Sequence, residues 1–446
     1  MSEQNTRDLK FRHELYPGSA ALLALSEDIT ASVLNHEQAT GRRQRHRRKD
    51  DLNSFRNAVA VIVANLAYSF VFPGSGSGAL ILPLGHPRST ASLTQPGFGK
   101  ALKSTIDALE AIGILHLTMP DDAFHAATVA PSEVFRREVF SRGVGHSDDF
   151  LRRQVLDPIC MTRRDAWKRR HPCIIPVSDD AARYREEVRR LNAWLADADL
   201  SYVGADEVDT GDRLMRRHFS LPSHVKDIRL AYGGRFFGGF WQPMRKQLRR
   251  HIRIDGEEIA ELDYGQILPR LAYGLVGTMP PRGDLYGFGS SLAGNHYRPA
   301  VKKALNAMLF SSRPMRAWPL EIADGLPHGV TVGKFRAALI DRHPALAPLL
   351  ECGVGYDLMF QESEVIGGVL RCCMDQGITA LPIHDAVLCA TSSVSAVQTI
   401  MLEQSRLVSG HSIPVGVEVL EEEEECSPLP VFVPAMTPST TTIHLP

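Results

Sequence analysis

The chain has 446 residues, 44% of them apolar and 23% charged, which suits two or three domains of an ordinary soluble globular protein. No apolar run approaches the roughly 20 residues of a membrane helix, and the polar segment Met1–Arg12 shows no signal peptide. Seven scattered cysteines without a CxxC pair favour reduced thiols, so we expect a cytoplasmic protein with no membrane contact.

The net charge of −1 conceals a strong separation of charge along the chain. Three segments are basic, at residues 42–49, 163–170 and 245–253, and one is acidic, at 421–425. Such blocks are compatible with a groove for a phosphate backbone, and equally with solvated surfaces and a flexible arm.

The first 120 residues divide into an arm and a small folded module. We expect residues 1–50 to be a flexible basic arm. After it, the hydrophobic pattern predicts a helix at Phe55–Tyr68, a glycine-rich turn at Phe72–Gly78, a strand at Ala79–Leu84, a helix at Phe98–Ile112 and a strand at Ile114–Leu117. Gly113 suits the C-cap of the second helix. Helix, glycine and strand in this order resemble the end of a winged-helix domain, at residues 51–120, which either binds DNA or only packs against its neighbours.

Composition and hydrophobic pattern predict the character of two later segments. Residues 121–230 are expected to be a mainly helical connecting region, with a clear amphipathic helix at Ser178–Ala196 that Ser178 can cap. Residues 421–446 combine the acidic run with a Pro/Thr-rich end, which predicts a disordered tail.

Two aspartates are placed where chemistry is expected. Ile259–Ile267 begins as a strand and turns polar at Asp263, and Ile378–Leu388 repeats the pattern up to Asp385. If the two strands lie side by side, their carboxylates can share two Mg²⁺ ions about 3.5–4 Å apart. Magnesium prefers oxygen ligands and keeps water positions open for substrate phosphates. The pair therefore predicts a two-metal site for nucleotidyl transfer, in which Mn²⁺ is a possible substitute.

A cationic helix is predicted between the two aspartates, at residues 297–310. Arg298 and Lys302 are four residues apart and therefore share one face, and Pro299 fits only near the start of the helix. Such a pair can grip a triphosphate, the arginine by bidentate bonds and the lysine as a point charge. Lys302 can also donate a proton to the pyrophosphate that leaves.

In this order, the segments resemble family A nucleic-acid polymerases, the group of DNA polymerase I and the single-subunit phage-type RNA polymerases. Glu261–Arg270 resembles motif A of that family, Arg298 to Phe310 resembles motif B, and Ile383–Asp385 resembles motif C. Weaker similarities lie at Gly234-Arg235 with Trp241–Pro243, at Asp284–Tyr286, at Gln361–Ser363 and at Ile413–Val419. The resemblance covers residues 230–420, a little under half of the chain.

The resemblance implies an α+β fold: a right-hand palm with reduced fingers at residues 231–420, a thumb-like role for 121–230, and a mainly helical N-terminal module. It also implies the roles of single residues. Asp263 and Asp385 would bind the metal ions, and Lys302 would act with them in catalysis. The nucleotide would contact Gln266, Leu268, Tyr286, Arg298, Lys302 and Phe310. The nucleic acid would contact Arg235, Gln242, Gln361 and His384.

Several positions depart from the family pattern. The aspartates are 122 residues apart (385 − 263), which is compact for the family. Leu268 stands where DNA polymerases usually have a glutamate that blocks a ribose 2′-hydroxyl, and Phe310 stands in place of a tyrosine. Asn306 occupies a commonly aromatic position, and Ala386 follows Asp385 where DNA polymerases often have glutamate. These departures leave the choice of sugar open.

The sequence therefore predicts a template-directed nucleotidyltransferase, a DNA polymerase of family A type acting in DNA replication. Its expected partners are a DNA or RNA primer–template and nucleoside triphosphates, and its oligomeric state stays open. Proofreading is not expected, because residues 1–230 contain no convincing set of exonuclease carboxylates. Two alternatives remain: an RNA polymerase or primase that starts chains de novo, and a DNA-binding replication initiator with an inactive palm.

Overall fold

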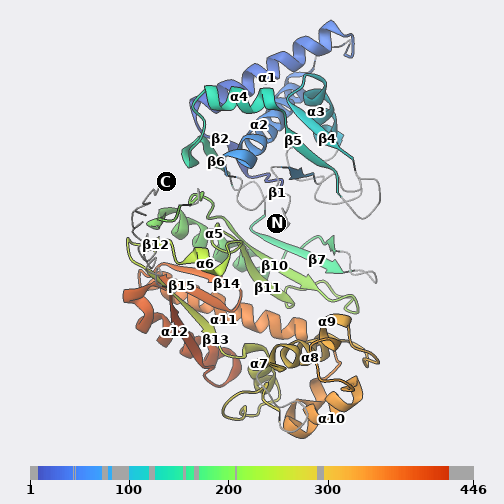
Figure 1. Ribbon diagram of the computed structural model, residues 1–446, viewed down its shortest axis with the longest axis vertical. Helices are drawn as coiled ribbons and strands as arrows, with labels where there is room; N and C mark the ends of the chain where they lie inside the picture. Colours follow the sequence, from blue (N-terminus) through green and yellow to red (C-terminus); the bar gives the residue numbers. More distant parts are fainter. Residues whose placement is uncertain are drawn as a thin grey trace, which may run out of the picture.

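The computed structural model describes residues 9–43, 45, 47–72, 79–82, 100–119, 126–153, 157–164, 170–205, 208–288 and 296–420. The fold is mixed α+β with several small sheets. Two modules, each with its own hydrophobic core, lie one above the other in Figure 1. The N-terminal core includes residues from Phe11 to Phe150, and the C-terminal core includes residues from Ile159 to Leu420.

The N-terminal module combines four helices with two small sheets. The helices are α1 (Ala20–Ala39), α2 (Lys49–Val71), α3 (Lys100–Ala111) and α4 (Glu133–Ser141). One sheet has the order β1 (Leu9–Lys10), β3 (Leu80–Ile81), β5 (Thr128–Pro131) and β4 (Leu115–Thr118), and the other pairs β2 (Leu15–Pro17) with β6 (Phe150–Arg152). Helix α3, Gly113 at φ 74° and strand β4 follow one another, which confirms the predicted order of helix, glycine and strand.

Helix α1 corrects the expectation of a flexible arm over residues 1–50. The Ser19 side chain caps this helix by accepting a hydrogen bond from the Leu22 amide at 3.3 Å. Leu22, Leu25, Ile29 and Val33 are buried, at a spacing of three or four residues that places them on one face. The sequence contains this helical spacing. The basic block at residues 42–49 led to the prediction of an arm over the whole segment.

Helix α2 is the central helix of the N-terminal core. Its length and apolar composition would allow it to cross a membrane, but 72% of its apolar window is buried inside the protein, as in the core helix of a soluble protein. The predicted helix Phe55–Tyr68 lies within it. The glycine-rich turn predicted next falls mostly on residues 73–78, outside the described residues, and β3 is the described part of the predicted strand Ala79–Leu84.

The C-terminal module contains two four-stranded sheets and a two-stranded one. The first has the order β11 (Gly233–Gly238), β10 (Met215–Leu221), β7 (Ile159–Arg164) and β8 (Arg170–Pro172). The second has the order β14 (Ala380–Ile383), β15 (Ala386–Ala390), β13 (Ile259–Tyr264) and β16 (Val415–Val419). Strands β9 (Leu200–Tyr202) and β12 (Ile252–Ile254) form the third.

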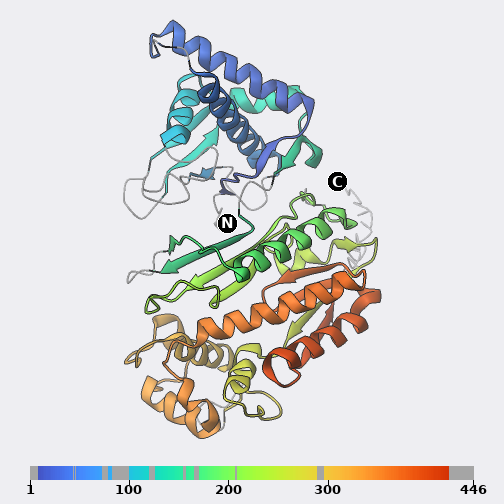
Figure 2. The same cartoon turned by 180° about the vertical axis from the view of Figure 1, so that it is seen from behind.

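Three long helices cover one face of these sheets: α5 (Asp179–Asp197), α11 (Gly355–Asp375) and α12 (Val394–Ser409) (Figure 2). The remaining helices are α6 (Lys246–Arg249), α7 (Ile267–Leu275), α8 (Arg298–Phe310), α9 (Leu320–Ala323) and α10 (Val332–Arg342). Helix α5 confirms the predicted amphipathic helix, with Ser178 as its N-cap. The expectation of a mainly helical 121–230 is wrong, because strands β5 to β10 also lie there, and their short alternating patterns are weak signals in the sequence.

Candidate active site

The register of the second sheet brings Asp263 and Asp385 together. Strand β13 pairs antiparallel with β15, with Asp263 opposite Ala386, and the Tyr264 amide donates to the Asp385 carbonyl at 3.3 Å. The strand expected over Ile378–Leu388 is in fact a hairpin, because β14 and β15 pair with each other around a two-residue turn, His384–Asp385. Asp385 therefore lies in the turn, not at the end of a single strand, and it is the neighbour of Asp263 across the sheet.

The local backbone around the two aspartates takes an uncommon conformation. His384 has φ 54° and Gln266 has φ 60°, in the left-handed region that side chains other than glycine and asparagine rarely adopt. Such a conformation costs of order 1 kcal/mol or more and persists where the surrounding structure holds it. Here the paired strands β14 and β15 hold His384, and helix α7 begins directly after Gln266.

The carboxylates form a strongly negative cluster. Partial burial, the charge of Asp385 and then the charge of Glu261 raise the pKa of Asp263 to about 6, against the opposing effect of Lys302 and Lys246. Glu261 forms ion pairs with Arg249 at 3.4 Å and with Lys246 at 3.8 Å. Mutual repulsion of this kind is what a bound divalent cation would relieve.

A further carboxylate, Glu362 on α11, is electrostatically close to this pair; the sequence pointed to its segment, Gln361–Ser363, but predicted no role for Glu362. It is fully buried, and it accepts two hydrogen bonds from Arg235, at 2.6 and 2.8 Å. Burial raises its pKa to about 7, although Arg235 lowers it and the charges of Asp385 and Asp263 raise it further. Arg235, expected to contact nucleic acid, is therefore bound to Glu362 beside Asp385. No local signal in the sequence marked it, because Glu362 stands among the polar residues Gln361, Ser363 and Glu364.

Helix α8 places the expected triphosphate residues on one face. It begins at Arg298, with Pro299 in its first turn, as predicted. Lys302 is exposed and close enough to lower the pKa of Asp263. Phe310, at the other end, is half-buried and lies edge-on to Tyr356 at 5.3 Å. Between them, the Asn306 Oδ1 atom is buried with no hydrogen-bond partner among the described residues.

Asp284 accepts hydrogen bonds from three of the residues that were expected to contact the nucleotide. It accepts bonds from the Arg298 Nε atom at 2.8 Å, from the Tyr286 amide at 3.1 Å and from the Gln266 side chain. Gln266 also accepts a bond from the Leu285 amide at 2.9 Å. The structure therefore brings Gln266, Tyr286 and Arg298 together, but Arg298 would have to leave Asp284 before it could bind a triphosphate.

The remaining predicted residues differ in their burial and in their hydrogen bonds. Gln242 donates to the Pro382 carbonyl at 2.9 Å and to the Phe236 carbonyl at 3.1 Å, so its amide ties β11 to β14. Leu268 and Gln361 are half-buried, on α7 and α11. His384 is exposed in the turn beside Asp385. The roles expected for these residues stay predictions.

A second buried network of hydrogen bonds surrounds Arg217, and it was not predicted from the sequence. Arg217 on β10 is fully buried and donates to Glu187 at 2.6 Å, Glu364 at 2.5 Å and Ser363 at 3.0 Å. It also donates to the Gly234 carbonyl at 2.9 Å. These bonds join α5, β10, β11 and α11, so they set the position of the strand that carries Arg235.

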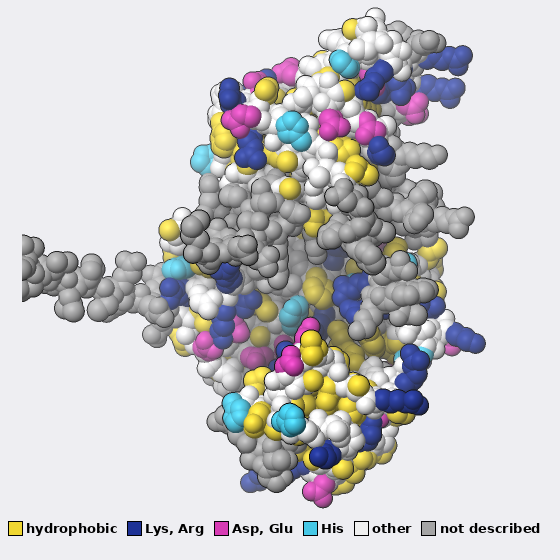
Figure 3. Space-filling model, turned by 45° about the vertical axis from the view of Figure 1, so that its right-hand side comes forward, with side chains coloured by type: hydrophobic (Ala, Val, Ile, Leu, Met, Phe, Trp, Pro, Cys, Tyr) yellow, Lys and Arg dark blue, Asp and Glu magenta, His cyan; other side chains and the backbone are white. Residues whose placement is uncertain are grey.

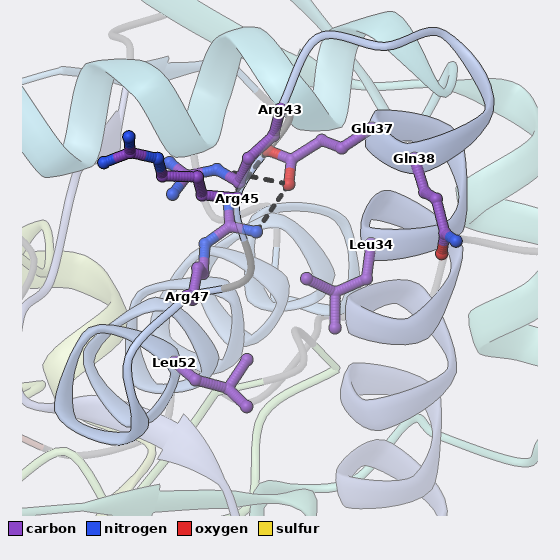
Figure 4. Close-up of a pocket in the computed structure, with 7 residues that line it drawn as sticks. All are labelled: Leu34, Glu37, Gln38, Arg43, Arg45, Arg47 and Leu52. Carbon is purple, nitrogen blue, oxygen red and sulfur yellow. Dashed lines mark hydrogen bonds and ion pairs between the residues drawn. The ribbon is translucent and has the colours of Figure 1, made fainter.

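Basic side chains gather in two further places. Figure 3 shows Lys and Arg with hydrophobic side chains on the walls of a hollow between the two modules. A separate pocket of about 260 Å³ lies between α1 and α2, lined by Arg43, Arg45 and Arg47 (Figure 4). Arg47 is held there by two bonds to Glu37, at 2.5 and 2.8 Å. The predicted basic block is therefore partly a built structure and not only a solvated arm.

Comparison with known proteins finds likeness among solved structures alone. No known family model matches the chain, and no curated protein matches it. Among solved structures, the chain is similar to the "POL domain of Pol1 from M. smegmatis complex with DNA primer-template and dNTP". The match has 12% sequence identity, a TM-score of 0.29, and covers 91% of this chain and 66% of that chain. A likeness at this TM-score is too distant to support an inference about function.

Proposed function

We propose that this chain is a template-directed nucleotidyltransferase of DNA polymerase type. The observation that supports the proposal is the pairing of β13 with β15, which sets Asp263 beside Asp385 at one end of an antiparallel sheet. In this proposal the sheet β14-β15-β13-β16 is the palm, α8 belongs to reduced fingers, and the N-terminal module is an accessory unit of winged-helix type.

The proposed reaction is in-line attack of a strand's 3′-hydroxyl on the α-phosphorus of a nucleoside triphosphate. The hydroxyl gives up its proton to water, a new O–P bond forms, the bond from the α-phosphorus to the oxygen bridging the α- and β-phosphates breaks, and pyrophosphate leaves. Lys302, exposed on α8 and electrostatically close to Asp263, would neutralise the phosphates and donate a proton to the leaving group. Arg298 would exchange Asp284 for the triphosphate, as a bidentate partner. Positioning and electrostatics would supply most of the rate.

The donor set suits magnesium. Among the described residues no group of three or more His, Cys, Asp or Glu side chains converges on one point, so an all-protein cage is not formed there. Magnesium does not need one, because it commonly binds through one or two carboxylates, water and substrate phosphates. Asp263 and Asp385 would hold two such ions, or Mn²⁺ in their place, and the ions would lower the pKa of the attacking hydroxyl and offset charge on the phosphates.

The test is incorporation of labelled nucleotides on a primed DNA template with Mg²⁺, with dNTPs and rNTPs in separate reactions. We expect Asp263→Asn and Asp385→Asn to lose incorporation by at least about 10³-fold while keeping the thermal stability of the wild type. Asp255→Asn is the matched control, because Asp255 is exposed in a turn of the same module at φ 54°, which asparagine tolerates. Full activity of Asp263→Asn, or equal loss in Asp255→Asn, would refute the proposal.

A further inference from the structure

The outward face of strands β10 and β11 carries an aromatic surface whose role the proposed reaction does not explain. The burial of β10 alternates along its length, with Met215, Arg217, Phe219 and Leu221 buried and the residues between them partly exposed. Arg216 and His218 therefore point to the face opposite the core. Helices α5, α11 and α12 cover the other side of the sheets (Figure 2).

Phe237 is the centre of this surface. Among the described residues only two phenylalanines are exposed, Phe237 at 40% and Phe140 at 58%. Phe237 lies opposite Arg216 in the register of β10 with β11. Phe237 lies near the end of β11, the edge strand of its sheet. A single exposed apolar side chain is common on protein surfaces, so it is the neighbours of this ring that indicate a contact surface.

Two histidine rings flank Phe237 and lead to the aspartates. The His218 ring lies 5.9 Å from the Phe237 ring, and the His384 ring lies 5.6 Å from it on the other flank. Thr162 fixes His218 through a contact of 2.8 Å to its Nε2 atom. Because His384 directly precedes Asp385, the row of three rings ends at the candidate reaction centre.

The charges around the row favour a polyanion. Burial, then Arg170 and Arg216, lower the pKa of His218 to about 4, so its ring is neutral at pH 7 and both arginines lie close to it. Arg235, two residues before Phe237, is held by Glu362 and is also electrostatically close to Asp385. An aromatic platform with cations at its rim is the arrangement that binds single nucleic-acid bases by stacking while the phosphates meet the cations.

We infer that Phe237, flanked by His218 and His384, is a stacking platform for the 3′-terminal base of the strand whose hydroxyl reacts. This inference rests on the proposed function, and it adds a binding residue for the nucleic-acid substrate. The contact is independent of base identity, because every base has an aromatic face. Phe237 holds the end of the strand and takes no part in the chemical step.

The test is equilibrium binding of a labelled primer–template, without nucleotide, followed by fluorescence anisotropy. We expect Phe237→Ala to weaken binding roughly 5- to 100-fold, and Phe237→Trp to restore it. A primer with an abasic 3′-terminal nucleotide should bind wild type and Phe237→Ala equally, because the stacked base is missing. Phe140→Ala is the matched control, since it removes an exposed phenylalanine from the other module and should leave binding unchanged.

The outcomes separate this inference from the proposed function. Equal binding by wild type and Phe237→Ala overturns it, and so does a loss that persists with the abasic primer. The same measurement in the Asp263→Asn background needs no catalysis, so Phe237-dependent binding there supports the platform even if no nucleotide is incorporated. In steady state, Phe237→Ala should raise the KM for primer–template and leave the KM for nucleotide within about twofold, whereas a misfolded site would change both.

Discussion

Glu362→Gln should change the pH dependence of stability, and the structure fixes the sign. Burial first, then the nearby charges of Asp385 and Asp263, raise the pKa of Glu362 from 4.5 to about 7 in the folded protein, despite the two hydrogen bonds from Arg235. Between these values the folded state binds more protons than the unfolded state. The wild type therefore loses stability as the pH rises from 4.5 to 7 and loses no more above that range.

The size of the effect follows from the same difference. At about 1.36 kcal/mol per pH unit, the rise from 4.5 to about 7 corresponds to roughly 3 kcal/mol. Glutamine does not titrate, so Glu362→Gln should lie close to the wild type at pH 4, below the unfolded pKa, and gain up to about 3 kcal/mol on it by pH 8. Urea unfolding at several pH values, with EDTA present, measures this difference.

Glu351→Gln is the matched control with the opposite sign. Burial alone would raise the pKa of Glu351, but bonds from Arg336 at 2.7 and 3.1 Å and from the Met315 amide at 2.7 Å lower it overall. Its loss should cost about 1–3 kcal/mol at pH 8. If Glu362→Gln is destabilised at pH 8 as Glu351→Gln is, the buried pair with Arg235 is net favourable when ionised and the reasoning about Glu362 is wrong.

Three further changes test other parts of the structure. Trp241→Phe removes the hydrogen bond from the fully buried indole to the Pro382 carbonyl at 3.0 Å and leaves a cavity. Urea unfolding should therefore show a free energy of unfolding lower by roughly 2–3 kcal/mol. A loss below about 0.5 kcal/mol would mean that this contact does not hold β14. Asn306→Leu removes a buried oxygen with no partner among the described residues and should raise stability by about 1 kcal/mol; a destabilised variant would show that the amide is bonded in solution. Arg45→Ala alters an exposed side chain of the pocket in Figure 4. It should lower the slope of log K for nucleic-acid binding against log salt concentration by about 1, without changing nucleotide incorporation at saturating template. An unchanged slope would exclude a phosphate contact by Arg45.

Strong periodicity in the sequence predicted the local elements and the charged residues at their ends. Helix α5, the start of α8 at Arg298, and the helix–glycine–strand order around Gly113 followed from spacing, capping and the fixed φ of proline. The two aspartates were visible because an apolar strand pattern turned polar at each of them. Helix α1 has the same kind of apolar spacing and could have been predicted. The segment was instead assigned to a flexible arm because it lies next to a basic block.

Which of these residues meet depends on how the chain folds over long distances in the sequence. The register of β13 with β15 depends on pairing between segments more than 100 residues apart, which no local pattern encodes. The hairpin at His384–Asp385 joins two adjacent strands, and its apolar run was predicted as a single strand. The partners of Arg235 and Arg217 likewise come from other elements, 127 and 30 residues away along the chain. Phe237 is exposed because α5, α11 and α12 cover the other face of the sheets, and the face that these helices cover depends on how the whole module packs around one hydrophobic core.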